Sequence, residues 1–369
     1  MPPRKGATQQ KKDINPIVAE FQQSCKVYNF QDEEVINQIL KYLNTSETII
    51  RLVNITLTPI LCKVLIRVFQ KCQKLQQIIL YSCYIMDPNF PKLLLKITTP
   101  HLVLDYTQIQ REFLIPLLSS PTLDILSLCG NQCLTPYNYI THELTSPYPP
   151  SLNLFFNSLT TSTIKVLNLY GCNIGDVGAI SLSNCLFFNT TLRCISLSRN
   201  RIGDEGAKYL AASLSHYELN EQETLIVEQL INEENKQKIS DEGGGLIKRK
   251  KGQKNAPKRQ QVKTPTKKTR NVKQNVERQL NFDPAAPVKP IIMAKWNNCI
   301  MINGGKRVIP GNNVVTSLIL DENLITENGA FALRDMLKLN NNIVQFSIDH
   351  NPEVDEKLAC ELKRQIKIE

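Results

Sequence analysis

Cysteine spacing is the first feature that suggests chemistry. Cys129 and Cys133 are close enough in the chain to share a metal ion, but only four histidines are present and none lies near this pair. A structural zinc ion takes four nitrogen or sulfur ligands, often from C-x-x-C pairs, and the chain has no such pair. A metal site is therefore not expected, and the eleven cysteines are interpreted as mostly small, reduced core residues.

Two further motifs resemble parts of catalytic sites. Gly304-Gly305-Lys306 resembles a phosphate-binding loop, but Ile300 replaces its first glycine and Arg307 its final Ser or Thr. The pairs Asp321–Glu322 and Asp349–His350 have side chains suited to acid–base catalysis, yet they fall at surface positions of predicted strands. No metalloprotease, serine-hydrolase or kinase signature occurs. The sequence thus predicts a protein that is not an enzyme and has no cofactor or small-molecule substrate.

A repeat of 28 residues organises the chain instead. Ile164-x-x-Leu167-x-Leu169-x-x-Cys172-x-Ile174 recurs as Leu192-x-x-Ile195-x-Leu197-x-x-Asn200-x-Ile202. Each copy then runs into Gly-Asp and a helix that opens with Gly-Ala. A short strand, a turn closed by Asn or Cys, and a returning helix form the pattern of a leucine-rich repeat. Because one unit cannot bury its own apolar face, the units are expected to stack into a solenoid.

Eight such units are predicted, of which the third is degenerate. The first is read as Ile50-x-x-Val53-x-Ile55, and the early units step by about 24 or 25 residues. We expect a curved α/β solenoid with parallel strands on its concave face and helices on its convex face. The predicted organisation is a disordered tail over 1–16, an N-terminal helical cap over 17–47, repeats over 48–216, a helix plus a disordered basic insertion over 217–313, and final repeats with a C-terminal cap helix over 314–369.

Positive charge is concentrated in the predicted insertion. Residues 248–278 hold 13 of the 44 Lys and Arg residues but only one of the 34 acids, so the rest of the chain is nearly neutral. With hardly any apolar residue, this segment cannot fold alone. Three interpretations stay open: a passive spacer, binding to an acidic polymer such as a tubulin tail or RNA, and a nuclear-import signal. The candidate polyanion-binding residues are Lys248, Arg249, Lys250, Lys251, Lys258, Arg259, Lys267, Lys268 and Arg270.

The concave face is the predicted protein-binding site. Between the leucines of each unit lie residues expected to point outward. In the first five units these are Leu52, Leu57, Ile79, Tyr81, Val103, Tyr106, Ile125, Val166 and Tyr170; in the last two they are Ser317, Asp321, Glu322, Gln345, Ser347 and Asp349. One end of the face is thus predicted to be apolar and aromatic, as at a protein interface, and the other polar and acidic. The alternative is that the N-terminal cap or a Pro- and Tyr-rich stretch near 136–150 folds over the apolar end.

The 28-residue units resemble the ribonuclease-inhibitor class of leucine-rich repeats. Residues 217–223, Tyr-Glu-Leu-Asn-Glu-Gln-Glu, a Lys-rich insertion, and residues 309–313, Ile-Pro-Gly-Asn-Asn, follow the order found in the leucine-rich repeat-containing protein 71 family. That family is associated with motile cilia and sperm flagella, so the resemblance implies a structural component of the axoneme. The alternatives are a nuclear or RNA-associated adaptor and a regulator of a small GTPase.

The ends and hydropathy of the chain bear on its location. No apolar run approaches the roughly 18 residues of a membrane-spanning helix. The first residues, MPPRKGATQQKKD, lack the apolar segment of a secretory signal. We therefore expect a soluble protein with no membrane partner, located in the cytoplasm and cilium, or alternatively in the nucleus.

Overall fold

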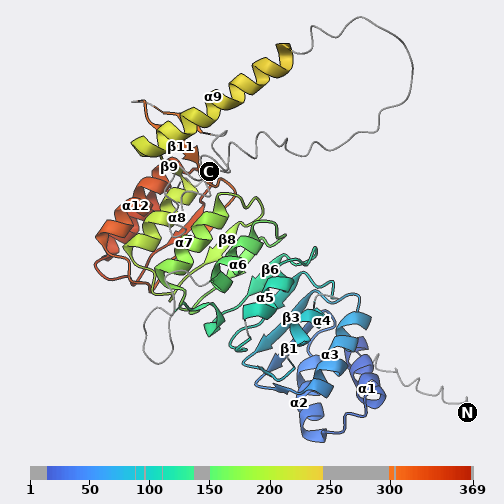
Figure 1. The fold of residues 1–369 in the computed structure, drawn as a ribbon. Helices are drawn as coiled ribbons and strands as arrows, with labels where there is room; N and C mark the ends of the chain where they lie inside the picture. The colour runs from blue at the N-terminus through green and yellow to red at the C-terminus, as the bar shows by residue number, and fades with distance from the viewer. Residues whose placement is uncertain are drawn as a thin grey trace, which may run out of the picture.

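Eight short strands form one parallel sheet along the protein in the computed structural model, which describes residues 15–87, 89–94, 97–109, 111–136, 150–243, 299–302 and 305–366 (Figure 1). In spatial order they are β1 (Ile49–Val53), β3 (Gln77–Tyr81), β5 (His101–Val103), β6 (Ile125–Ser127), β7 (Val166–Asn168), β8 (Cys194–Ser196), β12 (Ser317–Ile319) and β13 (Gln345–Ser347). The spatial order follows the chain, because each repeat unit contributes one strand to the sheet.

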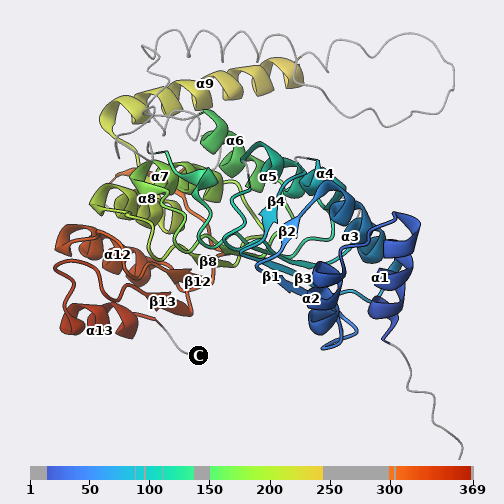
Figure 2. The ribbon, with the colours of Figure 1, turned by 90° about the horizontal axis from the view of Figure 1, so that it is seen from below.

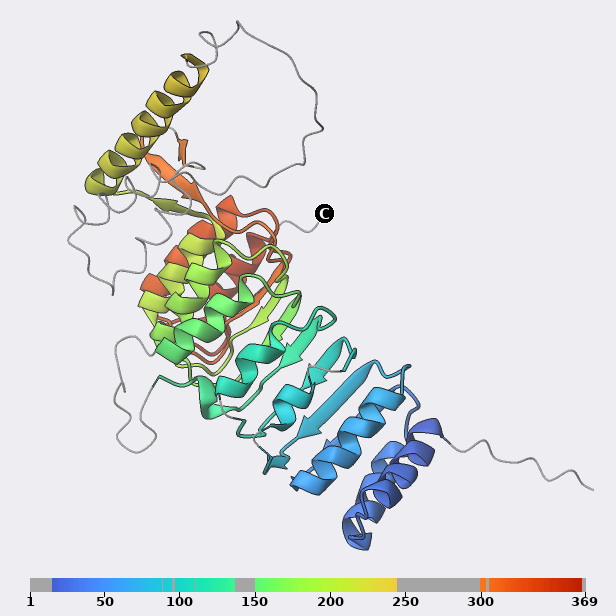
Figure 3. The same cartoon turned by 45° about the vertical axis from the view of Figure 1, so that its right-hand side comes forward.

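Helices cover the outer side of this sheet. They are α3 (Pro59–Lys71), α4 (Phe90–Leu94), α5 (Arg111–Leu117), α6 (Pro150–Leu159), α7 (Gly175–Leu186), α8 (Asp204–Leu214), α12 (Glu327–Leu339) and α13 (Glu356–Arg364). Figure 2 shows the strands on the inner side of an arc and the helices on its outer side, and Figure 3 shows the helices stacked in chain order. The α/β leucine-rich-repeat fold predicted from the sequence is therefore present.

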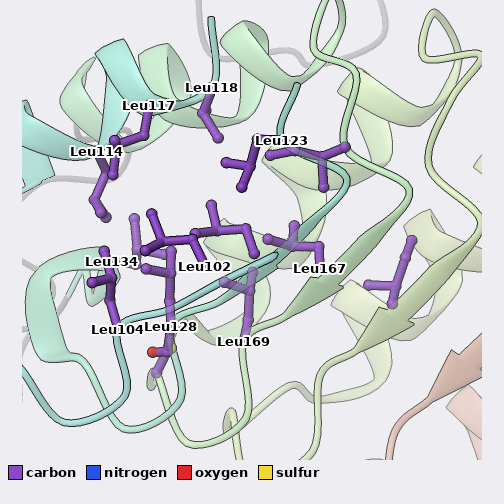
Figure 4. Packing of buried hydrophobic residues seen from close by; sticks show 14 of the residues in the cluster. Leu102, Leu104, Leu114, Leu117, Leu118, Leu123, Leu128, Leu134, Leu167 and Leu169 are labelled. Carbon is purple, nitrogen blue, oxygen red and sulfur yellow. The ribbon is translucent and has the colours of Figure 1, made fainter. Parts of the chain in front are cut away.

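The core is continuous from one end of the stack to the other. Strand leucines such as Leu102, Leu126 and Leu167 are at most 4% exposed and point toward the helices. Figure 4 shows the core at β5 to β7, where leucines of the strands and turns face Leu114, Leu117 and Leu118 of the α5 region. Each unit alone would expose an apolar side to solvent, and the neighbouring units bury it.

Buried turn residues link each unit to the one before it. Asn131 donates from Nδ2 to the carbonyl of Leu104 at 2.6 Å, and Asn351 does the same to Leu320 at 2.8 Å. Cys172 occupies the equivalent position and donates its thiol to the carbonyl of Leu128 at 3.1 Å. These side chains satisfy backbone groups that would otherwise be buried without partners, which is why a small polar residue recurs at this position.

Two helices precede the first strand. α1 (Pro16–Val27) packs on α3, and α2 (Glu33–Leu43) packs on β1. Asn15 and Asp32 cap them by accepting the backbone N–H groups of Ile17 and Val35 at 2.9 and 3.1 Å. The pair covers the end of the stack that β1 would leave exposed.

The segment between the sixth and seventh units leaves the stack and returns to it. β8 and β12 are neighbours in the sheet, with Ile195 opposite Leu318. Outside the stack, β9 (His216–Glu218), β10 (Ile300–Met301) and β11 (Arg307–Pro310) form an antiparallel sheet in the order β10-β11-β9. α9 (Glu221–Gly243) projects from this sheet (Figures 1 and 3), and Val227 joins Leu219 and Ile309 in a second, small core.

The structure corrects the predicted phase of the first unit. Ile50 pairs with Ile78 and Leu52 with Leu80, so the first two units are 28 residues apart, not 24 or 25. The predicted short step is confirmed for the next two units, where Ile78 pairs with Leu102 and Leu102 with Leu126. The true pattern is Ile50-x-Leu52-x-x-Ile55-x-Leu57, whose four apolar residues are at most 2% exposed. Leu52 and Leu57 were predicted to point outward, and that prediction is wrong: alternate residues of β1 face the core, and Leu52 lies two residues after Ile50. Leu57 belongs to β2 (Thr56–Leu57), which pairs with β4 (Tyr84–Ile85).

Candidate protein-binding face

The concave side of the sheet presents outward-facing residues in rows, because the strands are in register. Two rows are defined by the pairing. The first row is Ile49, Gln77, His101, Ile125, Val166, Cys194, Ser317 and Gln345; the second row is Arg51, Ile79, Val103, Ser127, Asn168, Ser196, Ile319 and Ser347. Both rows cross all eight strands.

An apolar stripe crosses four of these strands. It consists of Ile79 and Val103 in the second row on β3 and β5, followed by Ile125 and Val166 in the first row on β6 and β7. All four side chains are half-buried, which leaves part of each apolar surface in contact with solvent. The stripe therefore runs diagonally across the N-terminal half of the concave face.

Two tyrosines border the stripe where the strands end. The rings of Tyr81 and Tyr106 are 5.4 Å apart between centroids, at an interplanar angle of 62°, in an edge-to-face contact. They remain 40% and 41% exposed although each rests on its neighbour. Such a preformed aromatic pair loses little side-chain entropy when it binds a partner, which is a property of interface residues.

The turn backbone holds Tyr106 in place. Tyr106 has φ 54°, and the equivalent residue of every unit also has a positive φ, from Asn54 at 54° to His350 at 59°. Its ring lies over Gly130, where an added Cβ would come within 2.1 Å of the ring. A hydrogen bond with the Cys129 thiol raises the pKa of Tyr106 to about 12, so the phenol is neutral at physiological pH.

A charged pair follows the aromatic residues along the sheet. Arg199 Nη1 donates to Tyr170 Oη at 3.1 Å, and Arg199 Nε lies 2.8 Å from Glu322 Oε2. The guanidinium carbon is 5.8 Å from the centroid of the Tyr170 ring. Tyr170, Arg199 and Glu322 thus join the aromatic half of the face to its polar half.

The acidic residues of the polar half are engaged within the protein. Asp321 accepts from Ser347 Oγ at 2.5 Å and from the Asp349 N–H at 2.8 Å. Lys363 donates to both oxygens of Asp349, and this contact holds the pKa of Asp349 below its usual value. Ser317, which was predicted to be outward-facing, donates to Gln345 and is only 6% exposed, because it is covered by that neighbouring side chain.

The predicted site residues thus fall into distinct groups. Tyr81 and Tyr106 are exposed, while Ile79, Val103, Ile125, Val166 and Tyr170 are half-buried on one face. Leu52 and Leu57 belong to the core. The basic residues proposed to bind polyanions, from Lys248 to Arg270, lie outside the described residues, as does most of the predicted Pro/Tyr-rich stretch. The N-terminal cap packs on α3 and β1 and both tyrosines are accessible, which argues against the alternative that this cap folds over the apolar end.

Sequence reasoning missed several residues of this region. Arg51 is exposed in the second row, directly beside Ile79. Tyr84 and Met86, 59% and 51% exposed, follow the turn after β3, where Tyr84 belongs to β4. Asp105 accepts from Ser127 Oγ at 2.6 Å and from the Cys129 N–H at 2.9 Å, and burial raises its pKa. Asp321 and Ser347 occupy the same positions of their units and make the same contact, so this Asp–Ser pair recurs in the repeat.

Comparison with known proteins agrees with the geometry. Residues 160–183 and 188–211 match the family model described as Leucine Rich repeat. These segments hold the turns and helices of consecutive 28-residue units, so the chain carries leucine-rich repeats, a class of domain that generally mediates protein–protein interaction. A search of curated proteins finds no match for the chain.

Membrane-spanning helices and metal clusters are both absent from the described part of the chain. None of its helices has the length and apolar composition needed to cross a membrane. Among the same residues, no group of three or more His, Cys, Asp or Glu side chains is placed to hold a metal ion.

Proposed function

We propose that this protein is a non-catalytic scaffold that binds a protein partner through the N-terminal half of its concave face. The observation that carries the proposal is the exposed Tyr81–Tyr106 pair beside the half-buried apolar stripe. Strands of a continuous sheet fix these side chains before any partner arrives. Partner residues that pack on such a surface remove apolar area from water without ordering the scaffold, which favours affinity.

Site-specific photo-crosslinking in cells tests this proposal. A photoreactive amino acid replaces Val103 on the concave face or, as a matched control, Ile60, which is 48% exposed on α3 at the convex side. We expect a covalent adduct of discrete mass at position 103 and none at position 60. Adducts at position 60 alone, or the same adducts at both positions, would contradict the concave face as the binding surface.

We propose further that the scaffold works in the ciliary axoneme and has the helix-containing units of the ribonuclease-inhibitor class. Support comes from the resemblance of 217–223 and 309–313 to the ciliary family described above. The structure adds that these two motifs pair, with Ile309 opposite Tyr217 in the small antiparallel sheet. A tagged chain should co-localise with acetylated tubulin and stay with axonemes after detergent extraction. Accumulation in the nucleus would favour the adaptor alternative instead.

The basic segment 248–278 is proposed as an electrostatic contact to acidic tubulin tails. Its charge is the support: 13 cations against one acid in 31 residues. Binding of this kind weakens steeply as salt rises, because it depends on counterion release. Replacing its Lys and Arg residues with Gln should reduce co-sedimentation with microtubules at low salt. Removal of the tubulin tails should reduce binding of the wild-type protein by the same amount as the Gln replacements do. If either change leaves binding to microtubules unaltered, the segment is a spacer.

A further inference from the structure

The shape of the apolar stripe restricts what can bind to it. Ile79, Val103, Ile125 and Val166 lie on four consecutive strands. Neighbouring strands are about 4.8 Å apart, so the stripe spans about 14 Å across the sheet. Between Val103 and Ile125 it shifts by two residues along the strand direction, since Val103 pairs with Ser127 and not with Ile125. The occupant must therefore be elongated and must cross the strands.

Backbone hydrogen bonding distinguishes an extended occupant from a helical one. The strands under the stripe are interior, and their backbone groups are used in the parallel ladder on both sides. The four stripe side chains have no donor or acceptor. An extended segment lying on them would gain no backbone hydrogen bond from the stripe, and each of its N–H or C=O groups buried there without a partner would cost about 1–3 kcal/mol. An α-helix satisfies these groups internally, so it avoids this cost.

The spacing of the strands also fits a helix. Successive turns of an α-helix rise about 5.4 Å, which differs from the strand spacing by only about 0.6 Å. One apolar residue per turn then lies near each strand of the stripe, with the helix axis tilted to follow the two-residue shift between Val103 and Ile125. In an extended chain, side chains on one face recur every 6.6 Å or so, and the mismatch grows by about 1.8 Å at each strand.

Arg51 provides a charge at one end of the stripe. It pairs in register with Ile79, its side chain is exposed, and no hydrogen bond or ion pair to it is found among the described residues. Arg199, beyond the other end, is by contrast already bonded to Tyr170 and Glu322. The one unpartnered guanidinium beside the described stripe therefore lies at its β1 end, where it can meet an anion.

We propose, as a refinement of the function proposed above, that the partner presents an amphipathic α-helix. It crosses β3 to β7 with about three turns on the apolar stripe and carries a carboxylate on the turn next to Arg51. The exposed Tyr81–Tyr106 pair borders the helix on one side and packs against its flank. Helix-in-groove recognition of this kind uses apolar residues at i, i+3 or i+4, and i+7.

A displayed peptide library tests the proposal with two probes. In one pool, 15-residue segments are strong helix formers with randomised residues at the i, i+4, i+7 and i+11 positions and at both ends. In the other, proline at every third position prevents a helix. Both pools are selected on the full-length protein and on its Arg51→Glu variant. A Val103→Arg variant tests whether the selected peptides occupy the stripe, and Ile60→Arg on the convex side is its matched control.

The expected result is enrichment of helical peptides with an acidic residue near one end. Their affinity should fall about tenfold on Arg51→Glu, as for a charge pair whose sign is reversed, and peptides selected on that variant should be basic at the same end. Val103→Arg should abolish binding and Ile60→Arg should not. Enrichment of the proline pool alone at the Val103-dependent site would overturn the helix but not the scaffold function. If neither pool gives Val103-dependent binders, the result would contradict both the helical partner and the scaffold function.

Discussion

Asn323 accepts hydrogen bonds from the backbone N–H groups of Asn200 and Ile202, at 2.9 and 3.1 Å, although more than 120 residues separate them in the chain. The same side chain donates to the carbonyls of Leu197 and Leu320, both at 3.0 Å. It thus satisfies four buried backbone groups in the turns of the sixth and seventh units, which the insertion separates in the chain. Asp204 acts similarly on the helical side, where it accepts from the N–H groups of Thr326 and Gly329.

Replacement of Asn323 with alanine should therefore destabilise the whole protein. Four backbone groups would lose their partner in a buried turn, and we expect a loss of about 2–4 kcal/mol in the free energy of unfolding. Urea unfolding followed by circular dichroism measures it. Asn341→Ala, at an exposed position in a neighbouring turn, is the control and should change stability by less than about 0.5 kcal/mol. If both variants changed the free energy of unfolding equally, the Asn323 hydrogen bonds would not contribute to stability.

Replacement of residues 244–298 with a flexible Gly/Ser linker of about 20 residues should leave folding intact. The reason is that β8 pairs directly with β12, and closure entropy depends only weakly on the length of a connecting loop. One cooperative transition is expected in calorimetry, with a midpoint close to that of the full chain. Two separate transitions would mean that units one to six and units seven and eight fold independently.

The sequence predicted the stack well because its signal is repeated. A pair of apolar residues separated by one residue, most often Leu-x-Leu or Ile-x-Leu, recurs in eight units, and an error in one unit leaves the others correct. The first unit was misread because Leu52 and Val53 are both apolar, so two phases fit equally well. Only pairing with Leu80 decides that Leu52 faces the core. The register of strand pairing depends on tertiary structure, and a short run of apolar residues does not determine it.

The candidate site was predicted less completely for a different physical reason. Tyr81 and Tyr106 occupy different positions in their units, one at the end of a strand and the other at the left-handed turn residue. Gly130 and Gly171 at that turn position indicate a positive φ, but Tyr106, Arg199 and Glu322 have no such preference and adopt it because the stack requires it. Their outward direction follows from this backbone conformation. Tyr106 and Glu322 were predicted to point outward from their place in the repeat, whereas Arg199 was not.

Gly130 and Tyr106 should be energetically coupled. Alanine at Gly130 or at Gly171 takes an unfavourable positive φ of 69° or 65°, which costs about 1–2 kcal/mol at either position. At Gly130 the added Cβ also meets the Tyr106 ring, whereas at Gly171 the nearest atoms are 3.9 Å away. Gly130→Ala should therefore cost at least about 1 kcal/mol more than Gly171→Ala.

A double-mutant cycle isolates that contact. In a Tyr106→Ala background the extra cost of Gly130→Ala should disappear, because the ring is absent. Gly171→Ala should cost the same in both backgrounds. If the extra cost persists without the ring, it reflects strain in the turn and not the packing of Tyr106.

Asp105 should give the protein an unusual dependence of stability on pH. Burial raises the pKa of its carboxyl above the usual value of 3.8, against the opposing effect of hydrogen bonds from Ser127 and Cys129. The folded state therefore binds the proton more tightly than the unfolded state. Between the unfolded and the folded pKa, this residue makes stability fall as pH rises.

Asp349 provides the opposite case within the same sheet. Its hydrogen bond with Lys363 lowers its pKa, so its contribution to stability is present above about pH 4 and is lost as pH falls through the folded pKa. Unfolding free energies of the wild type, Asp105→Asn and Asp349→Asn, measured from pH 3 to about pH 7, separate the two contributions. Compared with Asp105→Asn, the wild type should lose stability as pH rises above about 4. Compared with Asp349→Asn, the wild type should lose stability as pH falls below about 4. Parallel pH profiles for wild type and Asp105→Asn would show that solvent reaches the Asp105 carboxyl freely.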